Sequence, residues 1–146
     1  MDTTAHDDDI AAWALEQAQL LRSGQLQLID AERIAEEMID LSLSERRGIS
    51  SRFVVLMQHL LKWQYQPERR GASWRNTIRV QRRAIERTLR RTPSLRHLLD
   101  DPEWIEENWD DAVDCVVRET GLDLAVLPAQ CPWSMAQLRD DSFLPA

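Results

Sequence analysis

Residues 53–91 read FVVLMQHLLKWQYQPERRGASWRNTIRVQRRAIERTLRR. Before the proline, apolar residues recur at spacings of three and four, which is the pattern of one buried helical face. The same spacing resumes after the glycine at Trp74, Ile78, Ile85 and Leu89. Pro67 disfavours a helical residue before it, and Gly71 tolerates a positive φ, so a turn is predicted between them. The stretch therefore predicts two amphipathic helices, with Ser73 as the N-cap of the second.

The helix that ends near Tyr65 begins far upstream. Asp30 is suited to cap its N-terminus, and no proline interrupts the chain between Asp30 and Tyr65. Polar residues around Gly48 weaken helix propensity, so we expect one long helix that is bent or loosened there. An earlier helix is predicted from the cap Asp9 to the stop at Ser23–Gly24. The apolar stripes of these two helices include Ile10, Trp13, Leu20, Leu21, Ile34, Met38 and Leu41.

Two Xaa-Pro signals organise the rest of the chain. Thr92 before Pro93 predicts the start of a short helix through Leu99, because proline favours the first position of a helix. Asp101 before Pro102 predicts the start of a longer helix that ends at Thr120–Gly121. One further short helix is expected in the C-terminal tail, at residues 134–139.

Composition agrees with an all-helical chain. Four glycines and six prolines in 146 residues are too few for a β-sandwich, and β-branched residues form no alternating run. The predicted fold is all-α, an antiparallel helical bundle with one long central helix and short C-terminal helices. The length fits a single domain over residues 1–146.

The N-terminus and the cysteines indicate a cytoplasmic protein. Residues 1–9 are acidic and lack the basic and apolar regions of a signal peptide, and no run of 18 apolar residues predicts a membrane span. Cys115 and Cys131 have neither the spacing of a zinc site nor that of a disulfide framework, so both are expected to be reduced thiols.

Basic residues are concentrated in one part of this acidic chain. The window from Lys62 to Arg96 holds eleven of the eighteen Lys and Arg residues against two acids, although the net charge is −7. Within it, Arg75, Arg79, Arg83, Arg87 and Arg91 recur every four residues and so lie along one side of a helix. Like charges at this spacing repel, so the row is expected to pack beside the chain's own carboxylates or to remain solvated. Candidate carboxylates are Glu36, Glu37, Asp40, Glu106, Glu107, Asp110 and Asp111.

The alternative is that the basic helix binds an anion from outside the chain. Its candidate anion face comprises Arg79, Arg82, Arg83 and Arg87, which suit phosphate or nucleic acid because guanidinium groups bind phosphate in a bidentate manner. Trp74 is the only aromatic residue of this helix, whereas single-stranded nucleic acid is usually bound by several aromatic rings. The sequence therefore favours the chain's own carboxylates over nucleic acid.

The run HLLKWQYQPERRGASWRNTIRVQRR, which starts at His59, closely resembles the signature of a bacterial family of helical proteins, domain-of-unknown-function family 29. Other stretches are similar to the same family: DDDIAAWALEQAQLLRSG, AEEMIDL, ETGL and CPWSMAQL. The resemblance covers nearly the whole chain and implies an all-α bundle and a soluble bacterial protein. It implies no activity. The chain departs from the family at Gly71, where a serine or another small residue is expected.

The turn and the residues beside it form the candidate ligand or partner site. It comprises His59, Trp63, Arg69, Arg70, Trp74 and Arg75, in which two tryptophans could bracket a groove lined by arginines. The alternative is structural: the rings close one end of the bundle, and the arginines brace the turn. His59 borders the apolar stripe, so we interpret it as a core histidine with a hydrogen-bond partner, in preference to a ligand or general base.

No catalytic, metal or cofactor motif accompanies these residues. The chain has no G-x-S-x-G segment or glycine-rich phosphate loop, and no histidine follows a glutamate at the spacing of a di-iron site. The sequence therefore predicts no catalytic residues, no metal site and no cofactor. The predicted role is a protein-interaction or regulatory module, whose partner is another protein or a second copy of the chain. The alternative role is a nucleic-acid or phosphate-binding module.

Overall fold

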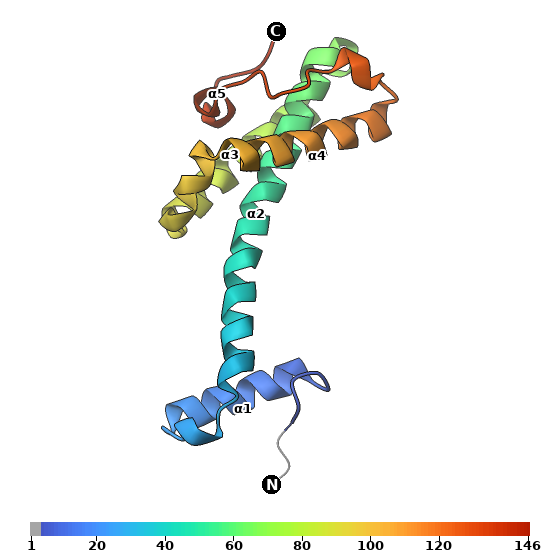
Figure 1. Ribbon diagram of the computed structural model, residues 1–146. Coiled ribbons are helices and arrows are strands. Elements are labelled where there is room, and N and C mark those ends of the chain that lie inside the picture. Colours follow the sequence, from blue (N-terminus) through green and yellow to red (C-terminus); the bar gives the residue numbers. More distant parts are fainter. Residues whose placement is uncertain (1–3) are drawn as a thin grey trace. The chain divides into compact units, whose positions relative to one another are not determined.

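The computed structural model describes residues 4–146, and every secondary-structure element in that range is helical (Figure 1). The α-helices are Ile10–Arg22 (α1), Ala31–Tyr65 (α2), Ala72–Arg91 (α3), Pro102–Thr120 (α4) and Met135–Arg139 (α5). Short 3-10 helices are Leu26–Leu28 (η1), Pro67–Arg69 (η2), Pro93–Asp100 (η3) and Leu124–Val126 (η4). The prediction of an all-α fold with one long helix is confirmed. Residues 1–3, the start of the acidic N-terminal segment, lie outside the described range.

The chain divides into two compact units. The N-terminal unit extends to Glu45, and the C-terminal unit is Arg46–Ala146. Helix α2 supplies residues 31–45 to the first unit and residues 46–65 to the second, and its α-helix continues through Gly48 without interruption. The predicted loosening at Gly48 is therefore not seen. The single domain over residues 1–146 stays a prediction.

Most predicted helix ends are confirmed by their capping contacts. The carboxylate of Asp9 accepts a hydrogen bond from the backbone N–H of Ala12 at the start of α1. Asp101 accepts from the first turn of α4, and Gly121 ends that helix with φ 73°. At α5, Ser134 and Gln137 form a reciprocal capping box. Short polar side chains thus set the starts of α1, α4 and α5, as the sequence indicated.

The start of α3 differs from the prediction. Gly71, not Ser73, is the N-cap, and Ser73 lies inside the helix. Gly71 has φ −171°, an extended conformation that any residue can adopt, so the expected positive φ is wrong. Thr92 precedes η3 without a side-chain capping bond, and η3 is a 3-10 helix, not an α-helix. In both places Pro67 or Pro93 directs the chain, and the hydroxyl side chain is not needed as a cap.

The C-terminal unit contains the hydrophobic core. Helix α3 runs antiparallel to α2, since Arg52 hydrogen-bonds to Gln81 and Lys62 lies over the ring of Trp74. Helix α4 runs in the same direction as α2, because Ser50 accepts from Trp104 and Lys62 pairs with Glu119 further along both helices. The core between these helices includes Phe53, Leu56, Leu60, Ile85, Leu89, Trp104, Trp109, Val116 and Leu138. Three helices and the tail therefore bury a continuous apolar interior.

The N-terminal unit has almost no interior. Its buried side chains, among residues 4–45, are Trp13 and Gln17, both from α1. Asp30 N–H donates to the amide oxygen of Gln17, which joins α1 to the start of α2. The apolar positions that the sequence assigned to buried stripes, such as Met38 and Leu41, are exposed here.

Candidate functional site

The turn between α2 and α3 is organised around the buried ring of Trp63. The guanidinium groups of Arg70 and Arg75 each lie 5.1 Å from the centre of this ring, which is a cation–π distance. Arg70 also donates through Nε to the Trp63 carbonyl at 2.6 Å. Arg69 is exposed on η2 and takes no part in this arrangement. The structure thus brings together three of the six predicted residues, and their contacts brace the turn.

Trp74 lies in a second contact of the same region. Lys62 Nζ is 5.7 Å from the Trp74 ring centre and 2.8 Å from the Glu119 carboxylate. The hydrogen bond from Lys62 is the main cause of the lowered pKa of Glu119. Lys62 and Glu119 were not among the predicted residues. Glu119 is far away in sequence, and only the pairing of α2 with α4 places it here.

His59 is a partly buried histidine with a hydrogen bond inside its own helix. Its Nδ1 donates to the Val55 carbonyl at 2.8 Å. Burial lowers its pKa below 6.5, and the positive charge of Lys62 lowers it further, while the Val55 bond and Glu119 act in the opposite direction. The imidazole is therefore neutral at pH 7. Within the described residues no group of three or more His, Cys, Asp or Glu side chains could hold a metal ion.

The arginines of α3 fall into separate environments. Arg82 is 1% exposed, and its guanidinium donates to the carbonyls of Leu138, Phe143 and Gln137 at 2.8, 2.8 and 3.3 Å. Burial lowers its pKa, and Asp141 and Asp140 oppose that shift. Arg82 is therefore no part of an anion face. It holds the C-terminal tail against α3. The row of arginines spaced four residues apart beside it in the sequence did not indicate this role.

A second contact fixes the same tail. Glu86 receives two hydrogen bonds from Arg139, at 2.7 and 3.0 Å. This bidentate bond is the main cause of the lowered pKa of Glu86 and of the raised pKa of Arg139. The only acidic residue of α3 is thus directed at α5.

The other predicted anion-face residues are exposed. Arg79 donates to the amide oxygen of Asn76 at 2.7 Å. Arg83 and Arg87, with Arg90 and Val80, line a hollow of about 410 Å³. Across residues 4–146, none of these arginines lies within ion-pair distance of a carboxylate. The expected ion pairs of these arginines with Glu106, Glu107, Asp110 and Asp111 are thus not formed. Arg79, Arg83 and Arg87 are instead exposed to solvent, which was the other expectation.

A groove between α2 and α4 was not predicted. It has a volume of about 570 Å³, and its wall includes Val54, Val55 and the Cys115 thiol. Asn108 lies at its floor with 4% of its surface exposed, and its amide nitrogen has no hydrogen-bond partner. Arg118 contacts the Cys115 sulfur at 3.4 Å. Sequence reasoning missed the groove because it depends on how two distant helices pair.

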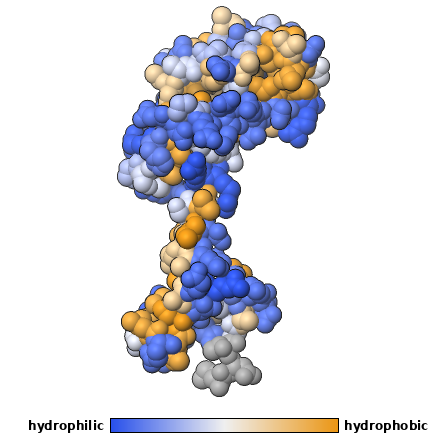
Figure 2. Space-filling model, viewed as in Figure 1, coloured by the Kyte–Doolittle hydropathy of each residue, from blue (hydrophilic) through white to orange (hydrophobic). Residues whose placement is uncertain are grey.

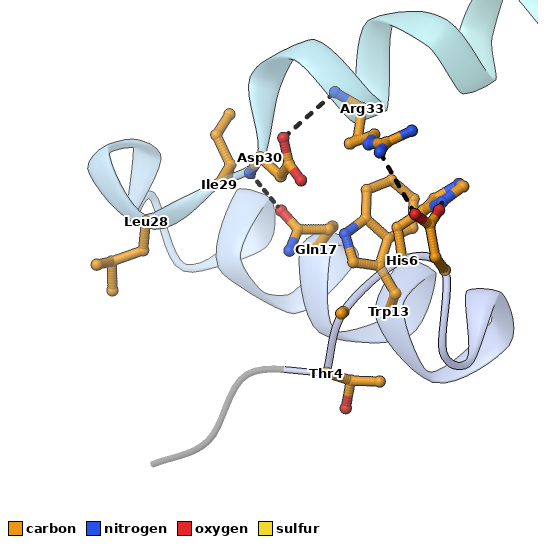
Figure 3. A pocket seen from close by; sticks show the side chains of 10 residues that line it. Thr4, His6, Trp13, Gln17, Leu28, Ile29, Asp30 and Arg33 are labelled. Carbon is orange, nitrogen blue, oxygen red and sulfur yellow. Dashed lines mark hydrogen bonds and ion pairs between the residues drawn. The ribbon is translucent and has the colours of Figure 1, made fainter.

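A pocket of about 540 Å³ lies in the N-terminal unit, between the start of the described chain, α1 and the start of α2 (Figure 3). The His6 ring packs edge-on against Trp13, and its two nitrogens donate hydrogen bonds to the carboxylates of Asp7 (2.8 Å) and Glu37 (2.6 Å). Asp7 also pairs with Arg33 at 3.6 Å. The bond to Asp7, followed by the bond to Glu37, raises the pKa of His6 above 6.5.

The same unit exposes most of the chain's large apolar surface groups. Nine of the thirteen exposed large hydrophobic side chains of the described residues fall between Ile10 and Leu43. They are Ile10, Leu15, Leu21, Leu26, Leu28, Met38, Ile39, Leu41 and Leu43. Figure 2 shows apolar side chains gathered over the end of α1 and η1, with more along α2. This surface was not predicted from the sequence, because each amphipathic stripe was expected to be covered by another helix.

Comparison with known proteins decides the family. The profile described as "Domain of unknown function DUF29" matches residues 5–144. The chain belongs to this family. The match confirms the resemblance of the segment that begins at His59 and assigns no activity. Searches of curated proteins and of solved structures found no match for this DUF29 chain. None of its described helices is long and apolar enough to cross a membrane.

Proposed function

We propose that this DUF29 protein is a protein-binding module and that its N-terminal unit carries the binding surface. The supporting observation is that residues 4–45 expose nine large apolar side chains and bury only two residues. Monomeric proteins rarely leave such a surface uncovered, and units of about 40 residues seldom build a sufficient core alone. A partner that covers these side chains would supply the missing burial.

The first part of α2 presents apolar groups on two sides. Residues 38–44 are all exposed. At 3.6 residues per turn, Met38 and Leu41 share one side, whereas Ile39 and Leu43 lie on nearly the opposite side. A helix that is apolar on two sides is normally enclosed by other elements. The side with Met38 and Leu41 and the side with Ile39 and Leu43 are therefore both open to a partner.

The charge of the N-terminal unit specifies the partner. Residues 1–45 contain eleven Asp and Glu against two Arg, a net charge of −9, whereas residues 46–146 carry 14 acids against 16 Lys and Arg, a net charge of +2. A second copy would bring two surfaces of charge −9 together. We therefore assign the surface to an amphipathic segment of another protein, rich in Lys and Arg and with an apolar face.

The test uses the full chain and a synthetic amphipathic helical peptide, with Leu on one face and Lys on the other. We expect binding by calorimetry, and at least tenfold weaker binding with Met38→Ser/Leu41→Ser. The matched control is Leu124→Ser/Val126→Ser, which alters two equally exposed apolar residues of the C-terminal unit and should not weaken binding. A peptide with Glu in place of Lys should bind far less.

Three results would count against this function. The Glu peptide could bind as tightly as the Lys peptide, or the Met38/Leu41 variant could bind like the unaltered chain. Sedimentation equilibrium of the chain alone could also show a dimer that Met38→Ser/Leu41→Ser dissociates. That last result would assign the surface to a second copy.

The proposed role is binding rather than catalysis, in the cytoplasm. Cys115 and Cys131 are both free thiols, which supports a reducing compartment. Labelling of both thiols in protein extracted under alkylating conditions would test this location.

A further inference from the structure

Helix α3 carries a local charge opposite to that of the whole protein. Its twenty residues include seven arginines and one acid, Glu86, while the chain as a whole is −7. Glu86 forms its two hydrogen bonds with Arg139, and Arg90, four residues further along the helix, interacts with it only through longer-range charge. Within α3 itself, seven arginines therefore outnumber one carboxylate that is already bonded to Arg139.

Several of the seven arginines already have structural partners. Arg75 lies over the ring of Trp63, Arg79 donates to Asn76, and Arg82 is buried with three carbonyl acceptors. Such contacts fix these guanidinium groups in place. They explain part of the arginine content of the helix without any external ligand.

Arg83, Arg87 and Arg90 differ from these arginines. All three are exposed, and together with Val80 they line the hollow of about 410 Å³. Their spacing of four and then three residues places them on one face of α3. In the part of the chain that the structure describes, no carboxylate pairs with any of them. Three like charges thus share one face, and an anion bound there would relieve their repulsion.

We infer that Arg83, Arg87 and Arg90 form a binding site for the phosphate backbone of nucleic acid, separate from the proposed protein-binding surface. Guanidinium groups match phosphate oxygens in charge and geometry. With a rise of 1.5 Å per residue the three side chains span about 10 Å, enough to contact more than one phosphate of a chain. No aromatic or amide side chain lines the hollow. The hollow therefore offers guanidinium groups for phosphate oxygens and no aromatic ring on which a base could stack.

The negative charge elsewhere in the chain limits the strength of this binding. At low salt the whole-chain charge of −7 repels a polyanion, and at physiological salt charges beyond about 8 Å are screened. The local site then acts largely alone. Because three arginines neutralise about three phosphates, binding should depend on salt with a slope of log K against log[salt] near −2.7 for duplex DNA.

The experiment measures fluorescence anisotropy of a labelled duplex DNA with the full-length chain across a sodium chloride series. Arg83→Gln/Arg87→Gln/Arg90→Gln should weaken binding at least tenfold and remove most of the salt slope. Arg22→Gln/Arg46→Gln/Arg118→Gln removes the same charge from exposed positions elsewhere and should leave most of the affinity. Circular dichroism of both variants checks that the helices are intact.

Two outcomes would overturn the inference. One is the absence of DNA binding by the unaltered chain at low salt. The other is an equal loss of affinity in the two triple variants, which would indicate a response to net charge alone. Neither outcome bears on the protein-binding surface, because all variants in this experiment keep Met38 and Leu41.

Discussion

Leu41 and Leu56 lie in the same helix, yet their environments are opposite. Leu56 belongs to the C-terminal unit and is 0% exposed, whereas Leu41 belongs to the N-terminal unit and is 62% exposed. Both occupy apolar positions of a 3-4 pattern in α2. The difference arises from their neighbours: α3, α4 and the tail cover the C-terminal part of α2, and no helix among residues 4–45 covers Leu41. A pattern of apolar residues therefore specifies a face that needs covering, but not the molecule that covers it.

The largest effect is expected when the same Leu→Ala substitution is made at a covered and at an uncovered position of α2. Leu56→Ala should lower the free energy of unfolding of the C-terminal unit by about 2–5 kcal/mol, because it leaves a cavity in a packed core. Leu41→Ala should change the free energy of unfolding by less than about 0.5 kcal/mol, because substitutions at exposed positions usually have small effects. Urea denaturation followed by tryptophan fluorescence measures both. Similar losses for the two variants would contradict the division into a covered and an uncovered part.

The next prediction concerns how the tail completes the C-terminal unit. Arg82→Met should cost about 2–4 kcal/mol, because three carbonyls would lose a charged donor. Arg83→Met, at the neighbouring exposed position, should cost less than about 0.5 kcal/mol. The same denaturation experiment gives both values, and limited proteolysis of the tail should accelerate only in the Arg82 variant. A tail that stays protected in Arg82→Met would show that this clamp is not needed.

These two arginines also show how far the sequence could lead. The helices were predictable, because Asp9, Asp30, Asp101 and Ser134 mark their starts and the 3-4 spacing marks their faces. Arg82 and Arg83 are adjacent and chemically identical, so no local pattern separates the buried one from the exposed one. Their difference depends on the carbonyls of Leu138 and Phe143, which the fold brings from the tail. The partners of the arginine row were beyond prediction for the same reason.

The turn illustrates an intermediate case. Its position followed from Pro67, and its density of tryptophan and arginine correctly marked a region with specific contacts. The sequence could not show that Arg70 and Arg75 would share the ring of Trp63, or that Glu119 would meet Lys62. Those contacts require the register between helices, which depends on the packing of the whole unit.

The two histidines should give the units opposite responses to pH. His6 has a pKa raised above the unfolded value of 6.5 by Asp7 and Glu37, so its stabilising contribution is complete below 6.5 and is lost as pH rises through the folded pKa. His59 has a pKa lowered by burial, so its contribution is complete above 6.5 and is lost as pH falls through the folded pKa.

Urea titrations between about pH 5 and pH 8, the range in which histidine titrates, measure these contributions. His59→Gln should flatten the loss of stability of the C-terminal unit on acidification, and His6→Gln should leave that loss unchanged. Hydrogen exchange in α1 should respond to His6→Gln mainly on the acidic side. If His59→Gln loses as much stability on acidification as the unaltered chain, the proposed contribution of His59 is wrong.

The smallest effects involve two glycines, one in each unit. Gly71→Ser should stabilise α3 by about 0.5 kcal/mol, because the N-cap position is extended, a serine can accept a hydrogen bond there, and no atom lies within 4 Å of the added carbon. Gly24→Ser should destabilise the N-terminal unit by about 1 kcal/mol, since its φ of 73° is strained for other residues. Thermal denaturation can compare the two, and stabilisation by Gly24→Ser would contradict the assigned backbone conformation.

Amide hydrogen exchange along α2 in the full-length chain tests the central claim most directly. If the N-terminal unit lacks a covered core, residues 38–45 should exchange much faster than residues 53–61 of the same helix. Addition of the Lys-bearing amphipathic peptide should slow exchange in residues 38–45 and leave residues 53–61 unchanged. Equal, strong protection along the whole of α2 in the free, monomeric chain would contradict the account.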